Sequence, residues 1–200
     1  MQKLLLPDTN LVNEANEIVS QALTKNVYNH SLRTYFLGNK YAKSKSISYD
    51  DEELALVALF HDIGFHELYA DANRAFQVSS SLAIKDYLSV MGVEKGRVNV
   101  MMEAIDFHMQ LLPRWDKSEV AGLLQVGAHM DVLGTRKFAV QKDDRKAISN
   151  AFPKGGFVLE FGTCLCKSMK SLNAVTGLFA PLTCQAKDHY YDLEKEEVIL

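Results

Sequence analysis

Apolar residues recur at intervals of three and four along most of the chain, which is the spacing of one face of an α-helix. Alternating apolar and polar positions, which mark a strand, are scarce. Capping residues, glycines and prolines divide the helical pattern into segments. The predicted helices cover residues 10–25, 29–45, 48–64, 77–91, 95–109, 118–133, 143–151 and 158–179. We therefore predict an all-α fold, built as a single compact helical bundle.

The chain is 200 residues long, which is enough for one domain with a substantial apolar core. It contains neither an internal repeat nor a low-complexity linker, so we expect one domain over residues 1–200. The apolar segment 157–182 either completes the core or forms a dimer face. Because two-fold assembly is the common form of oligomer, the sequence is compatible with a homodimer.

The net charge and the length of the apolar runs limit the kinds of molecule that this protein is expected to bind. The 22 basic and 25 acidic residues give a net charge of -3 with histidine neutral, and the basic stripe of a nucleic-acid-binding protein is missing. No apolar run approaches the roughly 18 residues of a membrane span, and the N-terminus lacks the apolar stretch of a secretory signal. Three cysteines form no even disulfide framework. We expect a cytoplasmic protein that binds neither nucleic acid nor membrane.

Four residues are candidates for metal binding: His30, the adjacent His61 and Asp62, and Asp131. Two imidazoles and two carboxylates can hold one divalent ion and leave room for water. Asp62 falls in the last turn of its predicted helix, before a stop at Gly64, where the partial negative charge of the helix end disfavours a carboxylate unless a cation offsets it. His61 continues the apolar face of that helix. The alternative for this pair is a buried core histidine beside an exposed aspartate.

Asp131 continues the apolar face of the helix predicted at 118–133. A carboxylate on a core face is costly unless it is paired or coordinates a metal. The alternative is an aspartate that caps the turn at Gly134. His129, two residues earlier, is expected to point elsewhere. His30 is expected at the start of its helix, and its immediate sequence gives the weakest evidence for a metal ligand. It becomes a candidate because the other three residues require a second imidazole.

Further candidates lie around these four residues. His108 continues an inward face of the helix at 95–109 and can be a fifth ligand, a substrate contact or a core histidine. Arg33 follows His30 by one turn and Arg74 lies in a polar loop, so each can bind an anionic substrate or remain an ordinary surface arginine. His66 is expected at the rim of the site. The aromatic residues that can form the wall of a small pocket are Phe65, Phe76, Phe107 and Trp115.

The order His, His-Asp, Asp on separate helices resembles the HD-domain superfamily of metal-dependent enzymes. Asn-His-Ser-Leu-Arg, Leu-Phe-His-Asp-Ile-Gly and Asp-Val-Leu-Gly carry the resemblance, within a core at 27–135. Arg-Ala-Phe-Gln-Val, Ala-Ile-Asp-Phe-His-Met and Gly-Ala-His-Met-Asp-Val-Leu-Gly are similar to the cyanamide hydratase-like (urea hydro-lyase) branch. The resemblance implies an HD-domain fold with an N-terminal helix and a C-terminal helical extension. It also implies a metal site formed by His30, His61, Asp62 and Asp131.

The chain departs from several branches of this superfamily. Gln77 stands where the cyanamide hydratase-like branch carries an acid, with the spacing changed by one residue, and this bears on the substrate more than on the metal. Phe65 replaces the lysine of the cyclic-dinucleotide phosphodiesterases, whose Gly-Tyr-Pro motif is also missing. A two-iron oxygenase needs two more histidines; His108 can be one, but Ala83 stands near the other position. We therefore expect a single-metal site.

We expect a metal-dependent hydrolase or hydro-lyase that activates water with one divalent ion, zinc by preference, with iron, manganese and nickel also compatible. The resemblance implies a hydratase that acts on a small molecule such as cyanamide or a nitrile. The catalytic candidates are Asp62, His108 and Arg74, and the substrate-binding candidates are Arg33, Phe65, His66 and Gln77. Two alternatives stay open: a nucleotide or phosphate-monoester phosphohydrolase, and a non-catalytic HD-like binding domain.

Overall fold

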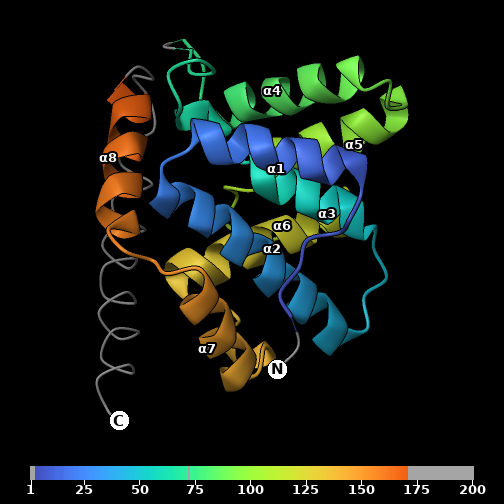
Figure 1. Cartoon of the computed structure of the whole chain (residues 1–200), viewed down its shortest axis with the longest axis vertical. Coiled ribbons are helices and arrows are strands. Elements are labelled where there is room, and N and C mark those ends of the chain that lie inside the picture. Colours follow the sequence, from blue (N-terminus) through green and yellow to red (C-terminus); the bar gives the residue numbers. More distant parts are fainter. Residues whose placement is uncertain (1–2, 72, 171–200) are drawn as a thin grey trace.

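The chain folds into a bundle of helices, as the apolar spacing predicts. The computed structural model describes residues 3–71 and 73–170, and within these ranges it contains no strand and no helix long and apolar enough to cross a membrane. Two short 3-10 helices, η1 (Ile63–Phe65) and η2 (Lys137–Ala139), follow α3 and α6. The α-helices (Figure 1) are α1 (Asn10–Ala22), α2 (Lys25–Lys45), α3 (Asp51–Phe60), α4 (Phe76–Val90), α5 (Lys95–Phe107), α6 (Glu119–Leu133), α7 (Lys142–Ala151) and α8 (Phe157–Lys170).

The boundary between the first two helices lies earlier in the sequence than predicted. α1 ends at Ala22, and the Thr24 hydroxyl accepts a hydrogen bond from the Val27 N–H, so that α2 begins at Lys25. His30 therefore lies in the second turn of α2 rather than at its start. The correction matters for the site, because a side chain in the second turn of a helix is positioned by a complete set of backbone hydrogen bonds.

The third helix is shorter at both ends than the sequence pattern predicts. Asp50, and not Ser48, caps α3, since its carboxylate accepts the N–H of Glu53. α3 ends at Phe60, and Gly64 lies within η1 rather than at the end of the helix. The chain therefore turns directly after α3, and His61 and Asp62 lie in this turn.

α3 and α6 form the centre of the bundle. Every residue from 54 to 60 is buried, and so is every residue from 120 to 128. Both segments are largely apolar around the whole helix, which is typical of helices covered on every side. α1, α2 and α5 pack against α3, while α2 and α5 also pack against α6. The two central helices therefore end inside the protein, close to the candidate site residues.

The backbones of α2 and α6 approach each other closely. A Cβ atom at Gly127 of α6 would lie 2.2 Å from the carbonyl oxygen of Thr34 on α2, so the crossing requires glycine. His30 lies one turn before Thr34, and Asp131 lies one turn after Gly127. The close crossing thus brings His30 and Asp131 to the same place.

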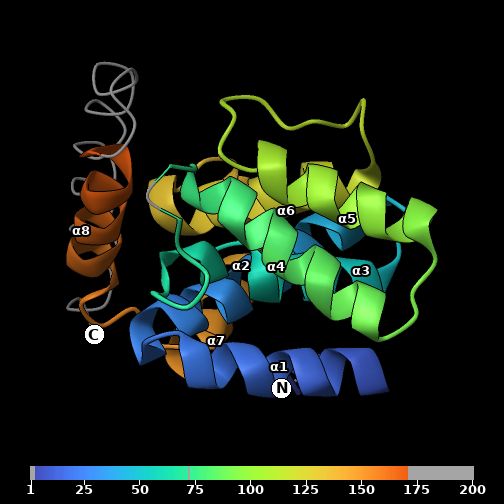
Figure 2. The ribbon, with the colours of Figure 1, turned by 90° about the horizontal axis from the view of Figure 1, so that it is seen from above.

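α8 lies at the edge of the bundle, beside α2. Figures 1 and 2 show it standing apart from α3 to α6 in two perpendicular views. Its first residue, Phe157, is buried, so this part of the segment 157–182 completes the core. The remainder of the predicted helix, 171–179, lies outside the described residues.

Candidate metal centre

The candidate site forms where the C-terminal ends of three helices meet α2. His61 and Asp62 directly follow α3, His108 follows α5, and Asp131 lies in the last turn of α6. His30 projects from α2. Each of these side chains is buried, and His108, His61 and Asp62 expose no more than 2 % of their surface. Because helix C-terminal ends carry partial negative charge, their meeting favours a cation at this place.

Each of the three imidazoles has its Nδ1 atom against a hydrogen-bond acceptor. The acceptors are Asp131 Oδ2 for His30 (2.7 Å), the Ala58 carbonyl for His61 (2.8 Å) and the Ile105 carbonyl for His108 (2.6 Å). A carbonyl oxygen only accepts, so the Nδ1 atoms of His61 and His108 carry protons. The same assignment suits His30 opposite a carboxylate. The three Nε2 atoms are thus left with lone pairs, which is the form in which imidazole binds a metal.

The Nε2 lone pairs of His30 and His61 converge with the carboxylate of Asp62. The two Nε2 atoms lie 3.2 Å apart, and Asp62 Oδ2 lies 3.7 Å from that of His30 and 3.4 Å from that of His61. One ligand atom from each residue lies within 4.8 Å of the other two. A hydrogen bond between the two Nε2 atoms would need an additional proton on one ring, whereas a cation between them needs none. We call His30, His61 and Asp62 the metal cluster.

The carboxylate of Asp62 is buried, and neither of its oxygen atoms has a hydrogen-bond partner among the described residues. A buried carboxylate without partners is costly, and native proteins keep such a group where it has a task, such as holding a cation. Burial raises the pKa of Asp62 to about 6, although the neighbouring His30 acts to lower it. At neutral pH the carboxylate is therefore largely ionised and able to bind a cation.

Burial also keeps the imidazoles of His61 and His108 neutral. Burial, assisted by the neighbouring His30, lowers the pKa of His61 to about 3. Burial and the neighbouring His61 hold the pKa of His108 well below its ordinary value. Because a metal competes with protons for imidazole nitrogen, histidines that stay neutral at pH 7 can bind an ion without releasing a proton.

Asp131 lies on the opposite side of the His30 ring from the metal cluster. Arg33 Nε donates to Asp131 Oδ1 (2.8 Å) and Arg33 Nη2 donates to Oδ2 (2.9 Å). Lys154 Nζ donates to the Asp131 backbone carbonyl (2.8 Å) and lies 3.4 Å from Oδ1. Burial acts to raise the pKa of Asp131, but Arg33, Lys154 and His30 together hold it well below its ordinary value. The structure thus brings three of the four expected ligands into one group and places Asp131 as the hydrogen-bond partner of His30.

Arg33, expected as a substrate contact, is buried and directed at groups of the protein. Besides its two bonds to Asp131, its Nη1 atom donates to the carbonyls of Phe152 (2.9 Å) and Pro153 (3.3 Å). All three guanidinium nitrogens therefore have acceptors within the protein. The arginine joins α2 to the segment before α8.

His108 lies beside the metal cluster, and its predicted inward orientation is observed. Its Nε2 atom lies 3.9 Å from Asp62 Oδ1, and its ring packs edge-on against that of His61, with 5.1 Å between centroids. It therefore adds a third imidazole lone pair on the Oδ1 side of Asp62, where it can act as a further metal donor or contact a substrate.

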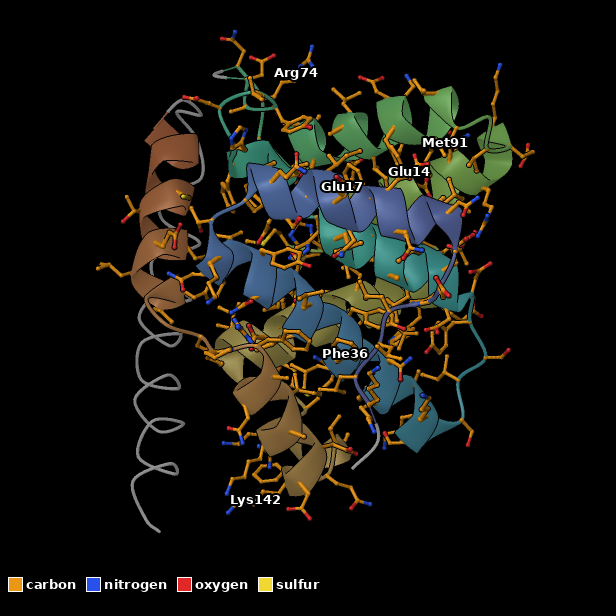
Figure 3. All side chains as sticks on the ribbon, in the orientation of Figure 1. Glu14, Glu17, Phe36, Arg74, Met91 and Lys142 are labelled. Carbon is orange, nitrogen blue, oxygen red and sulfur yellow. The ribbon has the colours of Figure 1, made fainter. Side chains whose placement is uncertain are left out.

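The remaining polar candidates lie between the end of η1 and the first turn of α4. Arg74 is half exposed on the loop between η1 and α4, at the top of Figure 3, and pairs with Asp71 at 3.3 Å. His66 follows η1, and its Nδ1 atom accepts the Leu68 N–H at 3.3 Å. Gln77 is partly buried in the first turn of α4. Among the polar contacts of the described residues, none links Arg74, His66 or Gln77 to the cluster.

Four phenylalanines form an aromatic wall over the cluster. Phe65 stacks on Phe76 (4.0 Å between centroids), and Phe76 contacts His108 (5.8 Å). Phe157 stacks on His30 at 4.4 Å, and Phe161 contacts both Phe157 (5.4 Å) and Phe65 (5.7 Å). The structure thus places Phe65 and Phe76 beside the site, as predicted.

The other two predicted wall residues pack elsewhere. Phe107 lies under the cations of Arg114 (4.6 Å) and Lys117 (5.3 Å). Trp115 packs against α6 at Gly122, where its ring occupies the space that a Cβ atom would take. Both residues stabilise the connection between α5 and α6 rather than the site.

Two contributors to the site were not predicted, namely Lys154 and the pair Phe157 and Phe161. The sequence pattern assigns the two phenylalanines to a core or dimer face, which is correct for the buried Phe157 but does not identify the ring it covers. Lys154 lies in a turn and carries no local signal. His129 does not join the cluster, as expected; burial lowers its pKa to about 4, and Gln125 Nε2 lies 2.9 Å from its Nδ1.

Comparison of the chain with protein-family models and with curated proteins gives no match. The chemistry of the cluster therefore carries the functional inference. Its residues fit a metal ion. The Nε2 atoms of His30 and His61 face each other, and the adjacent Asp62 carboxylate, whose pKa is about 6, has no hydrogen-bond partner in residues 3–71 and 73–170.

Proposed function

We propose that this chain is a metal-dependent enzyme of the HD type, with His30, His61 and Asp62 as metal ligands and His108 as an adjacent donor. The observation that carries the proposal is the buried carboxylate of Asp62. Within the part of the chain that the structure describes it has no hydrogen-bond partner, and it faces imidazoles whose Nδ1 atoms are already bonded. Nitrogen and carboxylate donors of this kind suit zinc, and they also accept iron, manganese or nickel.

Asp131 has a supporting role in this proposal, in place of the ligand role that the resemblance implies. Its carboxylate already accepts hydrogen bonds from Arg33 and from His30 Nδ1. A carboxylate that holds the far nitrogen of a ligand histidine fixes the ring orientation and raises the basicity of the metal-binding nitrogen. Arg33 and Lys154 keep Asp131 ionised for this purpose.

A divalent ion held by His30, His61 and Asp62 would supply Lewis acidity, the chemistry that lowers the pKa of water to about 7. The residues of the chain supply the proton transfers. Asp62 Oδ1 and His108 Nε2, 3.9 Å apart, can take a proton from water and return it to a product atom. The aromatic wall excludes bulk water, which strengthens the electrostatic effects inside the site.

Water addition to a small uncharged molecule is the reaction that we propose, with a cyanamide- or nitrile-like compound as substrate. In such a hydration the carbon gains the oxygen of water and the nitrile nitrogen gains its hydrogens, so no leaving group needs to be neutralised. The environment of the cluster supports a neutral substrate, because Arg33 and Lys154 are engaged with Asp131 and Arg74 pairs with Asp71.

The other two candidate functions have weaker support. Phosphate-ester hydrolysis needs cations directed at the phosphoryl oxygens. The cations beside the cluster, Arg33 and Lys154, are directed at Asp131 instead. A non-catalytic binding domain would have no use for the buried, ionised carboxylate of Asp62, which destabilises a fold that holds no cation.

The test is a product assay on the full chain after reconstitution with zinc. We would measure urea from cyanamide, amides from small nitriles, and phosphate from nucleoside monophosphates. The proposal predicts urea or amide formation that His61→Ala abolishes and that Asp144→Asn, which loses an ion pair with Lys40, leaves intact. Phosphate release alone would assign the phosphohydrolase function, and the lack of any product in all three assays would contradict an enzymatic role for this substrate class.

A further inference from the structure

The metal cluster is closed to solvent in this structure. The side chains of His30, His61 and Asp62 each expose about 1 % of their surface. A substrate or a metal ion therefore reaches the cluster only after part of its surroundings has moved. The element that moves should cover the cluster without contributing a ligand, and it should lie at the edge of the bundle.

The first turns of α8 have this position. Phe157 covers one face of the His30 ring, with 4.4 Å between centroids and 21° between ring planes. Phe161, one turn later, lies 6.3 Å from His30 and meets Phe65 of η1 edge-on at 5.7 Å. Phe157 and Phe161 therefore close the cluster on the side of α8.

α8 is a peripheral helix with a side-chain attachment at its first turn. It stands at the edge of the bundle beside α2 (Figures 1 and 2), and Leu159 on its outer side is 77 % exposed. The carboxylate of Glu160 accepts hydrogen bonds from Thr24 Oγ1 and from Asn26 Nδ2, the latter at 3.1 Å. These bonds join the start of α2 to the same part of α8 that carries Phe157 and Phe161.

The chain before α8 contains a turn that suits a hinge. Gly155 has a φ of +51°, which glycine adopts without strain, and Gly156 follows it directly. The preceding residues are fixed, because Arg33 holds the carbonyls of Phe152 and Pro153 and Lys154 holds Asp131. A rotation at the two glycines would move α8 and leave these contacts in place.

We propose that α8 is a hinged cover of the metal cluster, with Gly155 and Gly156 as the hinge and Glu160 as the latch to Thr24 and Asn26. The inference rests on the proposed function in that it regulates access to the same site. When the latch opens, Phe157 and Phe161 withdraw from His30 and a small uncharged molecule can enter. When it closes, the reaction is shielded from bulk water.

The test measures access to His30 directly, in the metal-free full chain. Diethyl pyrocarbonate is a small uncharged reagent that acylates neutral imidazole nitrogen, and peptide mass spectrometry gives a rate for each histidine. We compare the unmodified chain with Glu160→Ala and with the control Glu17→Ala, an exposed glutamate of α1 (Figure 3) that bonds Gln21 in its own helix. Loss of the latch is expected to raise the rate at His30 about tenfold, since its hydrogen bonds to a charged acceptor no longer oppose opening.

A second variant separates the latch from the stability of α8. Asn26→Asp places a carboxylate against that of Glu160, while an acid in the first turn of α2 favours that helix. It should also accelerate the reaction at His30, and His66, outside the cluster, should react at an unchanged rate in every variant. An unchanged acylation rate at His30 in both variants, or an equal rise at His66, would contradict the proposal that α8 covers the cluster.

This outcome is distinguishable from failure of the proposed function. If the chain takes up no metal but His30 is acylated faster in both latch variants, the result supports α8 as a cover and contradicts the proposed enzymatic function. If the chain binds metal but the acylation rate of His30 is unchanged in both latch variants, the result supports the metal centre and contradicts the role of α8 as a cover.

Discussion

His30 and Asp131 lie 101 positions apart in the sequence, and the His30 Nδ1 atom meets Asp131 Oδ2 at 2.7 Å. This contact turns the Nε2 atom of His30 toward His61 and Asp62. It exists because α2 and α6 cross closely at Gly127, one turn before Asp131. The geometry of the metal cluster therefore depends on a helix crossing and on a carboxylate that does not itself belong to the cluster.

Asp131→Asn should weaken metal binding without abolishing it. The amide oxygen can still accept the His30 Nδ1 proton but no longer carries charge, and loss of such a supporting carboxylate typically lowers metal affinity by about 10- to 100-fold. Calorimetric titration with zinc would measure the change, with the surface variant Asp144→Asn, which loses an ion pair with Lys40, as the control. Complete loss of binding in a folded Asp131→Asn protein would make Asp131 a ligand, as the resemblance implies.

Asp62→Asn should stabilise the metal-free protein and eliminate its metal binding. The pKa of Asp62 is raised from 3.8 to about 6 by burial, so its ionisation opposes folding at pH 7. The corresponding free energy is roughly 3 kcal/mol, and we expect a gain of about 1–3 kcal/mol because the amide is also left without a partner. Urea denaturation in the presence of a chelator measures the gain, and a less stable Asp62→Asn protein would show that the carboxylate has a structural partner.

The metal-free protein should lose stability as the pH falls from about 6.5 to 4. The pKa of His61 is lowered from 6.5 to about 3 and that of His129 to about 4, both chiefly by burial. Within this window the unfolded chain binds protons that the folded chain excludes, so acid favours unfolding. Three carboxyl groups act in the opposite direction and reduce the slope, because burial raises the pKa of Asp62 to about 6 and also raises the pKa values of Glu53 and Asp106.

The predicted slope is about 1.4 kcal/mol per pH unit for each net proton. Urea midpoints measured at several pH values in a chelating buffer give this slope. A midpoint that stays constant or rises between pH 6.5 and 4 would contradict the neutral, buried state of the histidines.

Gly127→Ala should destabilise the fold and disturb the metal cluster together. The added methyl group would lie 2.2 Å from the Thr34 carbonyl, so α2 or α6 has to shift. Overpacking of this kind typically costs about 1–3 kcal/mol. Gly162→Ala is the control, because a Cβ atom there meets nothing within 4 Å, and alanine favours the helix. Thermal unfolding with and without zinc measures both effects, and a Gly127→Ala protein as stable as the unmodified chain would show that the crossing tolerates a wider spacing.

The amino-acid sequence predicts the helices because their apolar spacing is local information. The pattern places helix boundaries less accurately where one side chain decides them: the Thr24 cap starts α2 at Lys25, and the Asp50 cap starts α3 at Asp51. The burial of Asp131 is predictable because this residue continues an apolar helical face. For Asp62 the sequence indicates only a place at a helix C-terminal end, where a carboxylate is disfavoured without a cation, and it leaves an exposed aspartate open. The sequence does not reveal which side of the His30 ring each carboxylate occupies.

The surroundings of the site depend on contacts between distant segments. Arg33 reads as a surface or substrate-binding arginine from its position one turn after His30, yet it is buried against Asp131, Phe152 and Pro153. Lys154 reaches Asp131 from a turn, where local pattern carries no information on direction. These contacts depend on the α2–α6 crossing and on the path of the segment before α8. The spacing of apolar residues along the sequence does not reveal either of these features.

The most direct test of the metal centre is the metal content per chain. Protein purified without a histidine tag or added metal, and then equilibrated with zinc and freed of excess, would be analysed by elemental mass spectrometry beside His61→Ala and His66→Ala. We expect one divalent ion per chain, lost in His61→Ala and retained in His66→Ala. An unmodified chain without bound metal after equilibration with zinc, iron, manganese and nickel in turn would contradict it.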